Sequence, residues 1–316
     1  MSEPRVTAVV LNYDGRHLLE IALPSLAAQR YRDFRTVVVD NGSTDDSRAW
    51  LAETWPTVEV VALAVNIGVT PALNVCVEAA RGELVALLNN DIELDPGYLG
   101  ELVAALDAHP RAGVAAAKLI DFHDRRRLDG AGDVFHWAGY AARRGQGELD
   151  RGQYDEARAI FGACGGAALY RRAAFAEVGL FDEQFEANLE DVDWSFRAQL
   201  AGHGSFYVPS AIAYHMGGAT LGARLEGRTL YLNWRNALWT IAKNYPAGAL
   251  VRHAPELIAL QLKGLAKSLR DRQLGIWLAV WRDALRGLPS ILRKRRAVQR
   301  SRRLGLRELE RLVGDR

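Results

Sequence analysis

Apolar residues in the first part of the chain follow two alternating patterns: short unbroken runs, and longer segments in which they recur every three or four residues. The runs have the length and the valine and leucine content of buried strands. They are residues 5–11, 36–40, 58–63, 84–88 and 113–119. The segments between them have the spacing of helices. They are residues 17–28, 44–53, 71–80 and 96–108. Strands that alternate with helices predict the α/β class, with a mainly parallel central sheet flanked by helices.

Polar residues follow four of the predicted strands, where the chain turns toward the next helix. In a parallel sheet these turns lie at one edge, beyond the carboxyl ends of the strands, where ligands bind. Such turns are commonly polar and rich in glycine, so one alone would indicate little, but four at one edge favour a binding site. Their sequences are Asn12-Tyr13-Asp14-Gly15, Asp40-Asn41-Gly42-Ser43, Asn66-Ile67-Gly68 and Asn89-Asn90-Asp91.

Two common nucleotide-binding motifs are absent from the sequence. No GxGxxG follows the first predicted strand, and no GxxxxGK followed by Ser or Thr occurs anywhere. A Rossmann dinucleotide site and a P-loop are therefore disfavoured. The content of 49% hydrophobic and 25% charged residues is that of a globular protein. Two cysteines, Cys76 and Cys164, exclude a disulfide framework and fit a reducing compartment.

Neither a signal peptide nor a membrane span is expected. The first residues, MSEPRV, lead directly into a predicted strand. Two long uncharged stretches, residues 60–77 and 198–223, are interrupted by glycine, proline and polar residues, whereas a spanning helix needs about 20 mainly apolar residues. We therefore expect a cytoplasmic protein.

The net charge of +2 hides an uneven distribution. Residues 247–316 hold 17 Lys and Arg but 6 Asp and Glu, whereas residues 1–246 hold 23 and 32. An acidic body that handles anions needs a metal or local backbone donors. A basic C-terminal part suits a polyanionic surface, either a membrane or a nucleic acid.

Seven motifs taken together resemble a known family. In chain order they are VVLNYDG, VVVDNGSTDDS, NIGVTPALN, LLNNDIELDPGYL, FGACGGAALYRRAAF, GLFDEQFEANLEDVDWSFRA and YHMGG. The set is similar, over residues 5–245, to the inverting glycosyltransferases of family 2, in particular bacterial rhamnosyltransferases and galactofuranosyltransferase-like enzymes of cell-envelope polysaccharide assembly. The resemblance implies a GT-A fold, which is Rossmann-like. Residues 1–245 would form the catalytic domain, with a nucleotide-binding half at about 1–120 and an acceptor and catalytic half at about 121–245.

The resemblance assigns the polar turns to the nucleotide of a sugar donor. Asp40 would bind the base or the ribose, although an acid that initiates a helix is the plain alternative. Asn12 and Tyr13 would hold or stack on the base, and the chain would pass close to the nucleotide at Asn66 and Gly68. The full set implied for nucleotide binding is Asn12, Tyr13, Asp40, Asn41, Gly42, Ser43, Asn66, Gly68, Asn89 and Asn90.

The chemistry of such a donor calls for a divalent metal. Its diphosphate is the leaving group, and a metal that bridges the phosphate oxygens stabilises the charge that develops there. Asn89-Asn90-Asp91 stands where the family has a DxD motif, but only Asp91 is an acid. The resemblance implies His215 as a further ligand for Mn²⁺ or Mg²⁺. A purely structural histidine is the alternative.

Three acids begin a predicted helix within residues 188–194. Carboxylates favour a helix N-terminus, and Asp193 with Arg197 could form a structural i,i+4 pair. An inverting transfer, however, needs one carboxylate to take the proton from the acceptor hydroxyl. The resemblance implies that this base is Asp191, that Glu190 helps to bind acceptor or sugar, and that Asp193 is the main competitor for the base.

Glycines within residues 161–170 would let the backbone approach donor sugar and acceptor, although a tightly packed strand is the alternative. We expect Gly165, Gly166 and Trp194 at the sugars. Cys164 is expected to be a small packing residue, because a single displacement needs no covalent intermediate. Residues 121–158 have many charges and glycines but little periodicity, which predicts a mobile loop on the acceptor side.

The C-terminal part combines helical periodicity with positive charge. Residues 224–243 have the spacing of a long helix, and an apolar stripe suited to one helix face follows. The stripe comprises Leu274, Trp277, Leu278, Trp281, Leu285 and Leu288. Seven basic residues then fall within 293–303. Residues 246–316 therefore predict a basic amphipathic helical tail, which either packs on the body with a solvated basic face or lies on an anionic membrane.

These features together predict an inverting, metal-dependent glycosyltransferase. It would move a sugar from a nucleoside diphosphate, with dTDP-L-rhamnose as the first donor and a UDP-sugar as the second. The acceptor would be a lipid-linked or polysaccharide glycan of the bacterial cell envelope, at the inner face of the plasma membrane. No nucleic-acid partner is expected, because no nucleic-acid module accompanies the basic run.

Three alternatives remain open. A sugar-1-phosphate nucleotidyltransferase would use a similar sheet, but it usually has a glycine-rich, basic loop where this chain has Asn12-Tyr13-Asp14-Gly15. A catalytically weak nucleotide-sugar-binding protein of the same fold would fit the weakened metal motif. A scaffold that recruits partners to a membrane through its tail would need no turnover.

Overall fold

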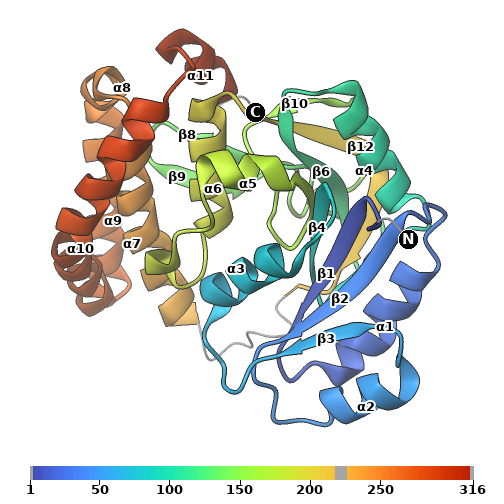
Figure 1. The fold of residues 1–316 in the computed structure, drawn as a ribbon. Helices are drawn as coiled ribbons and strands as arrows, with labels where there is room; N and C mark the ends of the chain where they lie inside the picture. The colour runs from blue at the N-terminus through green and yellow to red at the C-terminus, as the bar shows by residue number, and fades with distance from the viewer. Residues whose placement is uncertain (1–2, 218–225, 314–316) are drawn as a thin grey trace.

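The computed structural model describes residues 3–217 and 226–313. A central sheet carries helices on both faces, and the C-terminal helices pack along one side of this body (Figure 1). Four strands pair in parallel in the order β4-β1-β2-β3. They are β1 (Val6–Asn12), β2 (Phe34–Asp40), β3 (Glu59–Ala62) and β4 (Leu84–Asn89). Their register places Asn12 beside Asp40 and Leu11 beside Asn89, so the strand ends lie level with one another.

The sheet continues beyond β4 with strands of mixed direction. An antiparallel strand, β11 (Ala167–Arg171), separates β4 from a second parallel pair. That pair is β6 (Ala112–Asp121) and β12 (Gly204–His215). Short strands extend it: β5 (Ile92–Leu94), β7 (Leu128–Gly130) and β10 (Arg158–Ile160). A separate hairpin is formed by β8 (Asp133–His136) and β9 (Tyr140–Arg143).

Helices cover both faces of the sheet through two apolar clusters. Val38 of β2 lies in one cluster and its neighbours Val37 and Val39 lie in the other, because successive strand side chains point to opposite faces. One face is covered by α1 (Arg16–Ala27), α2 (Ser47–Thr54) and α4 (Tyr98–Ala108). The other is covered by α3 (Val69–Ala79), α5 (Arg172–Val178) and α6 (Glu190–Ala201), with the short helix η1 (Glu183–Phe185) before α6. The strands and helices predicted for the first 120 residues are thus confirmed, with bounds that differ by a few residues.

Residues 121–158 differ from the predicted loop. They contain β7, β8 and β9, and their turns use glycines with positive φ, such as Gly132 and Gly145. Lys118 of β6 is buried and pairs with both Asp150 and Asp155, which ties the far end of the segment to the sheet. Strands of three or four residues are too short to show a periodic pattern, which is why the sequence did not reveal them.

In the part of the chain that the structure describes, five helices follow the sheet. They are α7 (Glu226–Asn244), α8 (Ala247–Arg252), α9 (Ala254–Arg270), α10 (Leu274–Ser301) and α11 (Leu306–Leu312). The helix predicted at 224–243 is confirmed as α7, while residues 224 and 225 lie outside the described part of the chain. Within the described residues, no helix combines the length and the apolar content that crossing a membrane requires.

Helix α10 packs along α7, and its buried residues lie outside the predicted stripe. Val280, Ala284, Ile291 and Val298 form the buried seam, whereas Leu278 and two further leucines at seven-residue steps are exposed. The basic run is also divided. Lys294 bonds to Asp182 at 2.5 Å and Arg295 to the Ala242 carbonyl at 2.9 Å, so these cations attach α10 to the body. Helix α10 of the predicted tail is therefore packed on the body.

Candidate active site at the strand ends

Three of the four predicted turns meet at the side chain of Asn12. Asn12 Nδ2 donates to Asp40 Oδ2 at 3.0 Å, and Asn90 Nδ2 donates to Asn12 Oδ1 at 2.8 Å. All three side chains are buried. A Cβ on Gly15 would lie 2.1 Å from Asn90 Nδ2, so this close approach requires glycine. Tyr13 is half-buried in the same turn. The polar side chains at the level strand ends thus form one continuous surface.

Asp40 is fully buried, and each of its oxygens has two partners. Oδ1 accepts from Ser43 N at 3.1 Å and from Arg48 Nε at 2.6 Å. Oδ2 accepts from Asn12 Nδ2 at 3.0 Å and from Ser43 Oγ at 2.5 Å. Burial raises the pKa of Asp40, but these donors outweigh it and the pKa lies below its usual value. The carboxylate therefore joins the turn after β2 to β1, and its contact with a nucleotide stays a prediction.

The third turn packs against the second. Asn41 Nδ2 donates to Asn66 Oδ1 and to the Gly68 carbonyl, each at 3.2 Å. Gly42 has a φ of +78°, and a Cβ there would lie 2.2 Å from the carbonyl carbon of Val65. Only glycine fits at such a position. All four turns are therefore joined into one surface, as the parallel arrangement predicts.

The two residues predicted to bind a metal, Asp91 and His215, lie side by side. His215 Nε2 is 3.5 Å from Asp91 Oδ2, and the pairing of β5 with β12 holds the two segments together. Asp91 Oδ1 is buried and has no hydrogen-bond partner among the described residues, a costly state that a cation would relieve. A carboxylate and an imidazole suit Mn²⁺. In the described ranges no three His, Cys, Asp or Glu side chains gather as a metal site, so substrate phosphate and water would have to supply the remaining ligands.

Asp129 of β7 fixes the orientation of the His215 ring. His215 Nδ1 lies 2.8 Å from Asp129 Oδ2, and Arg143 Nη1 lies 2.6 Å from the same oxygen. A carboxylate on one ring nitrogen directs the other nitrogen toward a metal, and here Nε2 faces Asp91. Burial lowers the pKa of His215, but its bonds to Asp129 and Asp91 outweigh this and raise it to about 9.

Asp191 begins α6 with both oxygens held by backbone amides. Gly165 N donates to Oδ2 at 2.9 Å, and Val192 N donates to Oδ1 at 2.8 Å. The side chain is half-buried. Its hydrogen bonds come from neutral donors, and the helix N-terminus favours its negative charge. A carboxylate at this position, held by backbone amides, suits the role of a general base.

Two further carboxyls lie near Asp191. Burial and the charge of Asp191 raise the pKa of Glu190 to about 8. One oxygen of Glu190 is buried without a partner among the described residues. Burial and the same charge raise the pKa of Asp133, on β8, to about 7. At neutral pH the group therefore carries less negative charge than three ionised carboxylates would.

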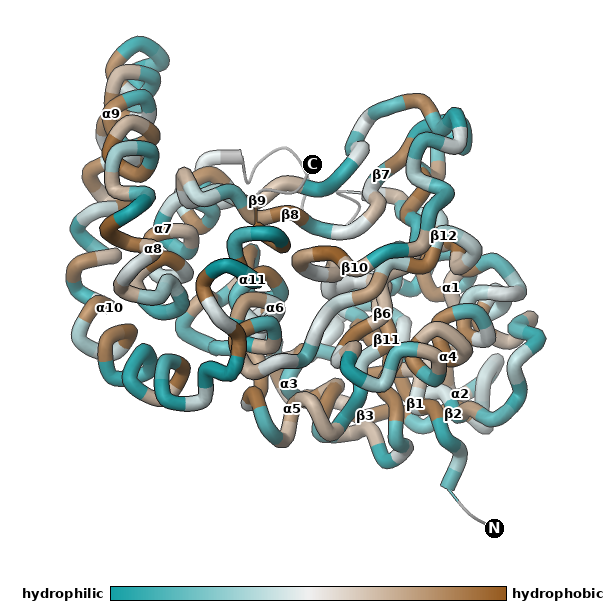
Figure 2. Tube along the Cα trace, turned by 90° about the horizontal axis from the view of Figure 1, so that it is seen from above, coloured by the Kyte–Doolittle hydropathy of each residue, from teal (hydrophilic) through white to brown (hydrophobic). Residues whose placement is uncertain are grey.

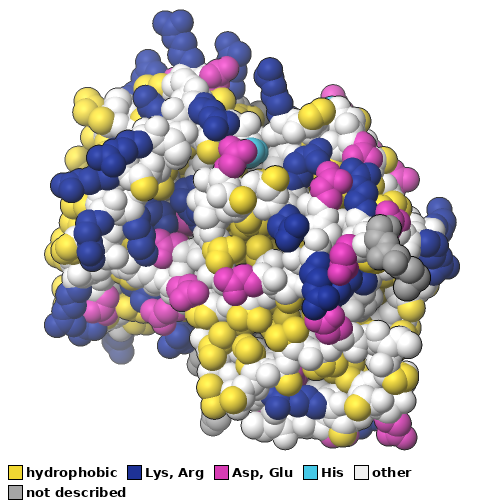
Figure 3. Space-filling model, in the orientation of Figure 1, with side chains coloured by type: hydrophobic (Ala, Val, Ile, Leu, Met, Phe, Trp, Pro, Cys, Tyr) yellow, Lys and Arg dark blue, Asp and Glu magenta, His cyan; other side chains and the backbone are white. Residues whose placement is uncertain are grey.

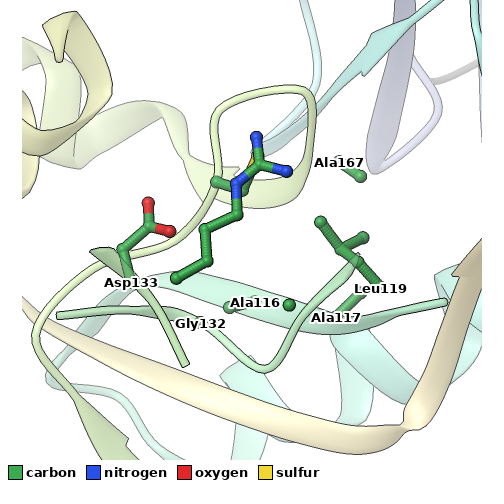
Figure 4. A pocket seen from close by; sticks show the side chains of 9 residues that line it. Ala116, Ala117, Leu119, Gly132, Asp133 and Ala167 are labelled. Carbon is green, nitrogen blue, oxygen red and sulfur yellow. The ribbon is translucent and has the colours of Figure 1, made fainter. Parts of the chain in front are cut away.

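A small recess lies beside these carboxyls. It is lined by Ala116, Ala117, Leu119, Gly130, Gly132, Asp133, Arg143, Cys164 and Ala167. Asp133 and Gly132 lie on one side of it, and Leu119 and Ala167 on the other (Figure 4). Burial raises the pKa of Cys164 to about 12, so the thiol stays protonated, as expected of a packing residue. The recess combines small apolar walls with a carboxyl and a guanidinium.

Gly165 and Gly166 let the chain before β11 approach two site residues. A Cβ on Gly165 would lie 3.1 Å from Asp191 Cβ, and one on Gly166 would lie 2.6 Å from Asn89 Nδ2. Asn89 N also donates to the Gly166 carbonyl at 2.8 Å. The glycines thus bring α6 and β4 to the same place, while their contact with a sugar stays a prediction.

Two expected site residues point away from the site. Asp193 is fully buried and accepts from Arg197 Nε at 2.9 Å, Lys243 Nζ at 2.8 Å and Asn244 Nδ2 at 2.9 Å. It is therefore a structural residue, which corrects its expected place as the main competitor for the base. Trp194 is also fully buried, and its Nε1 donates to the Gly179 carbonyl at 3.0 Å. It is a core residue, which corrects its expected place at the sugars.

Three residues of the site were not predicted from the sequence: Asp129, Asp133 and Arg143. All lie in the short strands of residues 121–158. The one local signal was the run DGAGD at 129–133, in which two acids flank closely spaced glycines. Nothing in that run shows that Asp129 meets His215, which is 86 residues away.

This combination of sheet, polar strand ends and carboxylate helix defines a GT-A glycosyltransferase. The family described as Glycosyl transferase family 2 matches residues 7–179, and the chain belongs to this family. The family and fold predicted from the motifs are thus confirmed.

Relatives extend this similarity over nearly the whole chain. An N-acetylglucosaminyl-diphospho-decaprenol L-rhamnosyltransferase of Mycobacterium tuberculosis is 28% identical over 331 residues, which cover 96% of this chain and 97% of the relative. Two solved structures share the fold at 18% identity. The mannosyltransferase PcManGT of Pyrobaculum calidifontis, in complex with GDP-Man and Mn²⁺, has a TM-score of 0.57 over 94% of this chain and 87% of its own. TarS 1–349 of S. aureus, in complex with UDP-GlcNAc, has a TM-score of 0.58 over 93% and 88%.

Proposed function

We propose that this glycosyltransferase is inverting and metal-dependent, and that it moves a sugar from a nucleoside diphosphate to a lipid-linked or polysaccharide acceptor of the bacterial cell envelope. The observation that carries the proposal is the environment of Asp191, that is, its burial and its hydrogen-bond donors. Asp191 is half-buried near the start of α6, and the backbone amides of Gly165 and Val192 donate to it. The next residue after Gly165, Gly166, contacts Asn89 at the end of β4, so Asp191 lies close to the polar strand ends. A base for an acceptor hydroxyl needs these properties.

Each part of the site has its own task in this proposal. The joined turns, with Asn12 and Asn41, would hold the nucleotide. Asp91 and His215 would hold a divalent metal, which when bound stabilises charge on the leaving diphosphate. Asp191 would take the proton of the acceptor hydroxyl while that oxygen attacks the anomeric carbon. One displacement at that carbon inverts its configuration.

The rhamnosyltransferase of M. tuberculosis supports the choice of substrates. Its name states an L-rhamnosyl group and an acceptor on a polyprenyl diphosphate, and it aligns with this chain end to end. We therefore place dTDP-L-rhamnose first among donors and UDP-sugars second. A lipid-linked acceptor places the reaction at a membrane, and the 17 Lys and Arg of residues 247–316 suit the anionic inner leaflet.

The test is a thermal-shift screen of sugar nucleotides with Mn²⁺, Mg²⁺ or EDTA, followed by transfer to a polyprenyl-diphosphate acceptor. A bound donor at 100 times its Kd adds about 2.7 kcal/mol of stability. We expect a shift with dTDP-L-rhamnose that needs the metal, and then product. No shift with any sugar nucleotide would contradict the proposal. Binding without transfer would favour a non-catalytic binding protein, and formation of a sugar nucleotide from a nucleoside triphosphate would favour a nucleotidyltransferase.

A further inference from the structure

Helix α9 is apolar on the side that faces away from the body. Ile258, Leu262 and Leu269 are 60%, 62% and 57% exposed. Successive residues of a helix turn by about 100°, so six exposed residues share an arc of about 100° on this side. We call this set the outer face of α9. It consists of Pro255, Ile258, Ala259, Leu262, Ala266 and Leu269.

The opposite side of α9 already supplies its packing on the body. Gly264 is buried against the Trp234 ring, where a Cβ would lie 2.4 Å from a ring carbon. Leu257 lies against Gly139 of the β8–β9 turn. A surface helix ordinarily places polar residues opposite such a seam. A contiguous exposed apolar face marks an interaction site instead.

Positive charge flanks the outer face. The exposed basic residues along this edge of α8 and α9 are Arg252, Lys263, Lys267 and Arg270; Arg252 pairs with Glu310, and Lys267 and Arg270 pair with Asp271. Helix α10 adds Arg293, Arg296 and Arg300, which are exposed and form no ion pair with any residue that the structure describes. Figure 3 shows Lys and Arg side chains gathered over the C-terminal helices, with hydrophobic patches between them. This pattern suits an anionic lipid surface, whereas a second copy of the chain would present the same positive charge and be repelled.

Helix α9 also connects this surface to the candidate active site. It extends away from the sheet (Figure 2), and its first turn meets the tip of the β8–β9 hairpin. The rings of Trp137 and His253 stack with centroids 4.6 Å apart, and the Tyr245 hydroxyl donates to the Trp137 carbonyl at 3.1 Å. The base of the same hairpin carries Asp133 and Arg143, which line the recess.

We propose that the outer face of α9 docks into the interface of an anionic lipid bilayer, and that the β8–β9 hairpin leads from there to the site. The second part rests on the proposed function, because it concerns a lipid-linked acceptor. The first part stands on the outer face and its charges alone. In this arrangement the apolar side chains enter the acyl boundary while the flanking cations stay at the headgroups.

Sedimentation with vesicles tests the docking. The vesicles contain phosphatidylcholine and phosphatidylglycerol in equal parts, and phosphatidylcholine alone serves for comparison. The wild-type chain should bind the mixed vesicles and lose binding as salt rises. The triple variant Ile258→Ser, Leu262→Ser and Leu269→Ser should bind at least about tenfold more weakly, because its apolar contribution is lost. Leu149→Ser, an exposed leucine on the body, is the control and should bind as wild type does.

Two results would overturn the docking proposal. One is equal binding of the triple variant and the wild type, with circular dichroism showing that both are folded. The other is that the wild type forms a dimer, the triple variant is a monomer, and neither protein binds the vesicles. Transfer to a short-chain, water-soluble acceptor separates this proposal from the proposed function. The triple variant should retain that transfer and lose transfer to acceptor in vesicles, whereas failure of the wild type with every acceptor would count against the function alone.

Discussion

Helix α6 carries two carboxylates, Asp191 and Asp193, on opposite faces, and the two have different surroundings. Asp191 faces the strand ends and is held by the amides of Gly165 and Val192. Asp193 faces α7 and is held by Arg197, Lys243 and Asn244. The donors to Asp191 are backbone amides, whereas the donors to Asp193 include the basic side chains of Arg197 and Lys243. These donors give Asp193 a structural role and leave Asp191 for the proposed role of general base, although both acids belong to the same motif.

The structural face also ties the C-terminal helices to the catalytic helix. Lys243 bonds to Asp182 at 2.7 Å as well as to Asp193, and Lys294 of α10 bonds to the other oxygen of Asp182. Burial lowers the pKa of Lys243 more than its two carboxylates raise it. One helix thus carries the proposed chemistry on one side and an anchoring ion network on the other.

The largest expected effect comes from Asp191→Asn. The variant keeps the shape of the side chain but removes the proton acceptor, so turnover should fall about a thousandfold. The donor Kd and the unfolding free energy should stay near their wild-type values, since the base acts in the transition state. Steady-state kinetics and calorimetric donor titration measure both. Ordinary turnover by this variant would show that another residue is the base.

Asp193→Asn should produce the reverse result. It leaves Lys243 and Arg197 buried with less counter-charge, which should cost about 3–5 kcal/mol of unfolding free energy. Urea unfolding measures the loss, and turnover per folded molecule should be largely retained. The matched control is Asp271→Asn, which removes an exposed partner of Lys267 and should change stability little. A fully stable but inactive Asp193→Asn enzyme would exchange the roles given to the two carboxylates.

Asp129→Asn should weaken metal binding without removing a ligand. The amide can still contact the His215 ring, but it loses the charge that orients and polarises it. Changes at such positions cost about 10–100-fold in metal affinity. Mn²⁺ titration followed by electron paramagnetic resonance gives the Kd without relying on activity. Asp124→Asn, on an exposed turn, is the control. An unchanged Mn²⁺ Kd in the Asp129 variant would remove Asp129 from the metal site.

Glu190→Gln should change the pH dependence of stability and leave the fold unchanged. The folded pKa of Glu190 is raised from 4.5 to about 8 by burial and by the charge of Asp191. Between these values the folded chain holds a proton that the unfolded chain has released, so Glu190 makes stability fall as pH rises. Urea unfolding across this range should show a shallower fall for the variant than for wild type. Parallel curves would mean that Glu190 is ionised in the folded protein.

The first 120 residues could be predicted because their elements are long and periodic. The polar turns after β1, β2 and β4 lie together simply because parallel strands end at one edge. The roles of Asp191 and Asp193 could not be separated in this way. The groups that distinguish them, Lys243 and Asn244, lie about 50 residues further along the chain.

Residues 121–158 show the same limit more strongly. Strands β7, β8 and β9 have three or four residues each, which is too few for a pattern to appear. Asp129 gains its place through its contacts with Arg143 and His215. The tail could be predicted in part. Its helical character follows from the sequence pattern. Which of its leucines and basic residues face the body depends on packing against α7, which the sequence alone does not show.

The stereochemistry of the product tests the central claim most directly. If Asp191 activates the acceptor for a single displacement, the transferred sugar must have the anomeric configuration opposite to that in the donor. One-bond carbon–proton couplings of the product, measured by NMR against the donor, report this configuration. We expect inversion with the wild-type enzyme, and about a thousandfold slower formation of product with Asp191→Asn. Retention of configuration would contradict the account, because it requires a second displacement that Asp191 acting as a base does not provide.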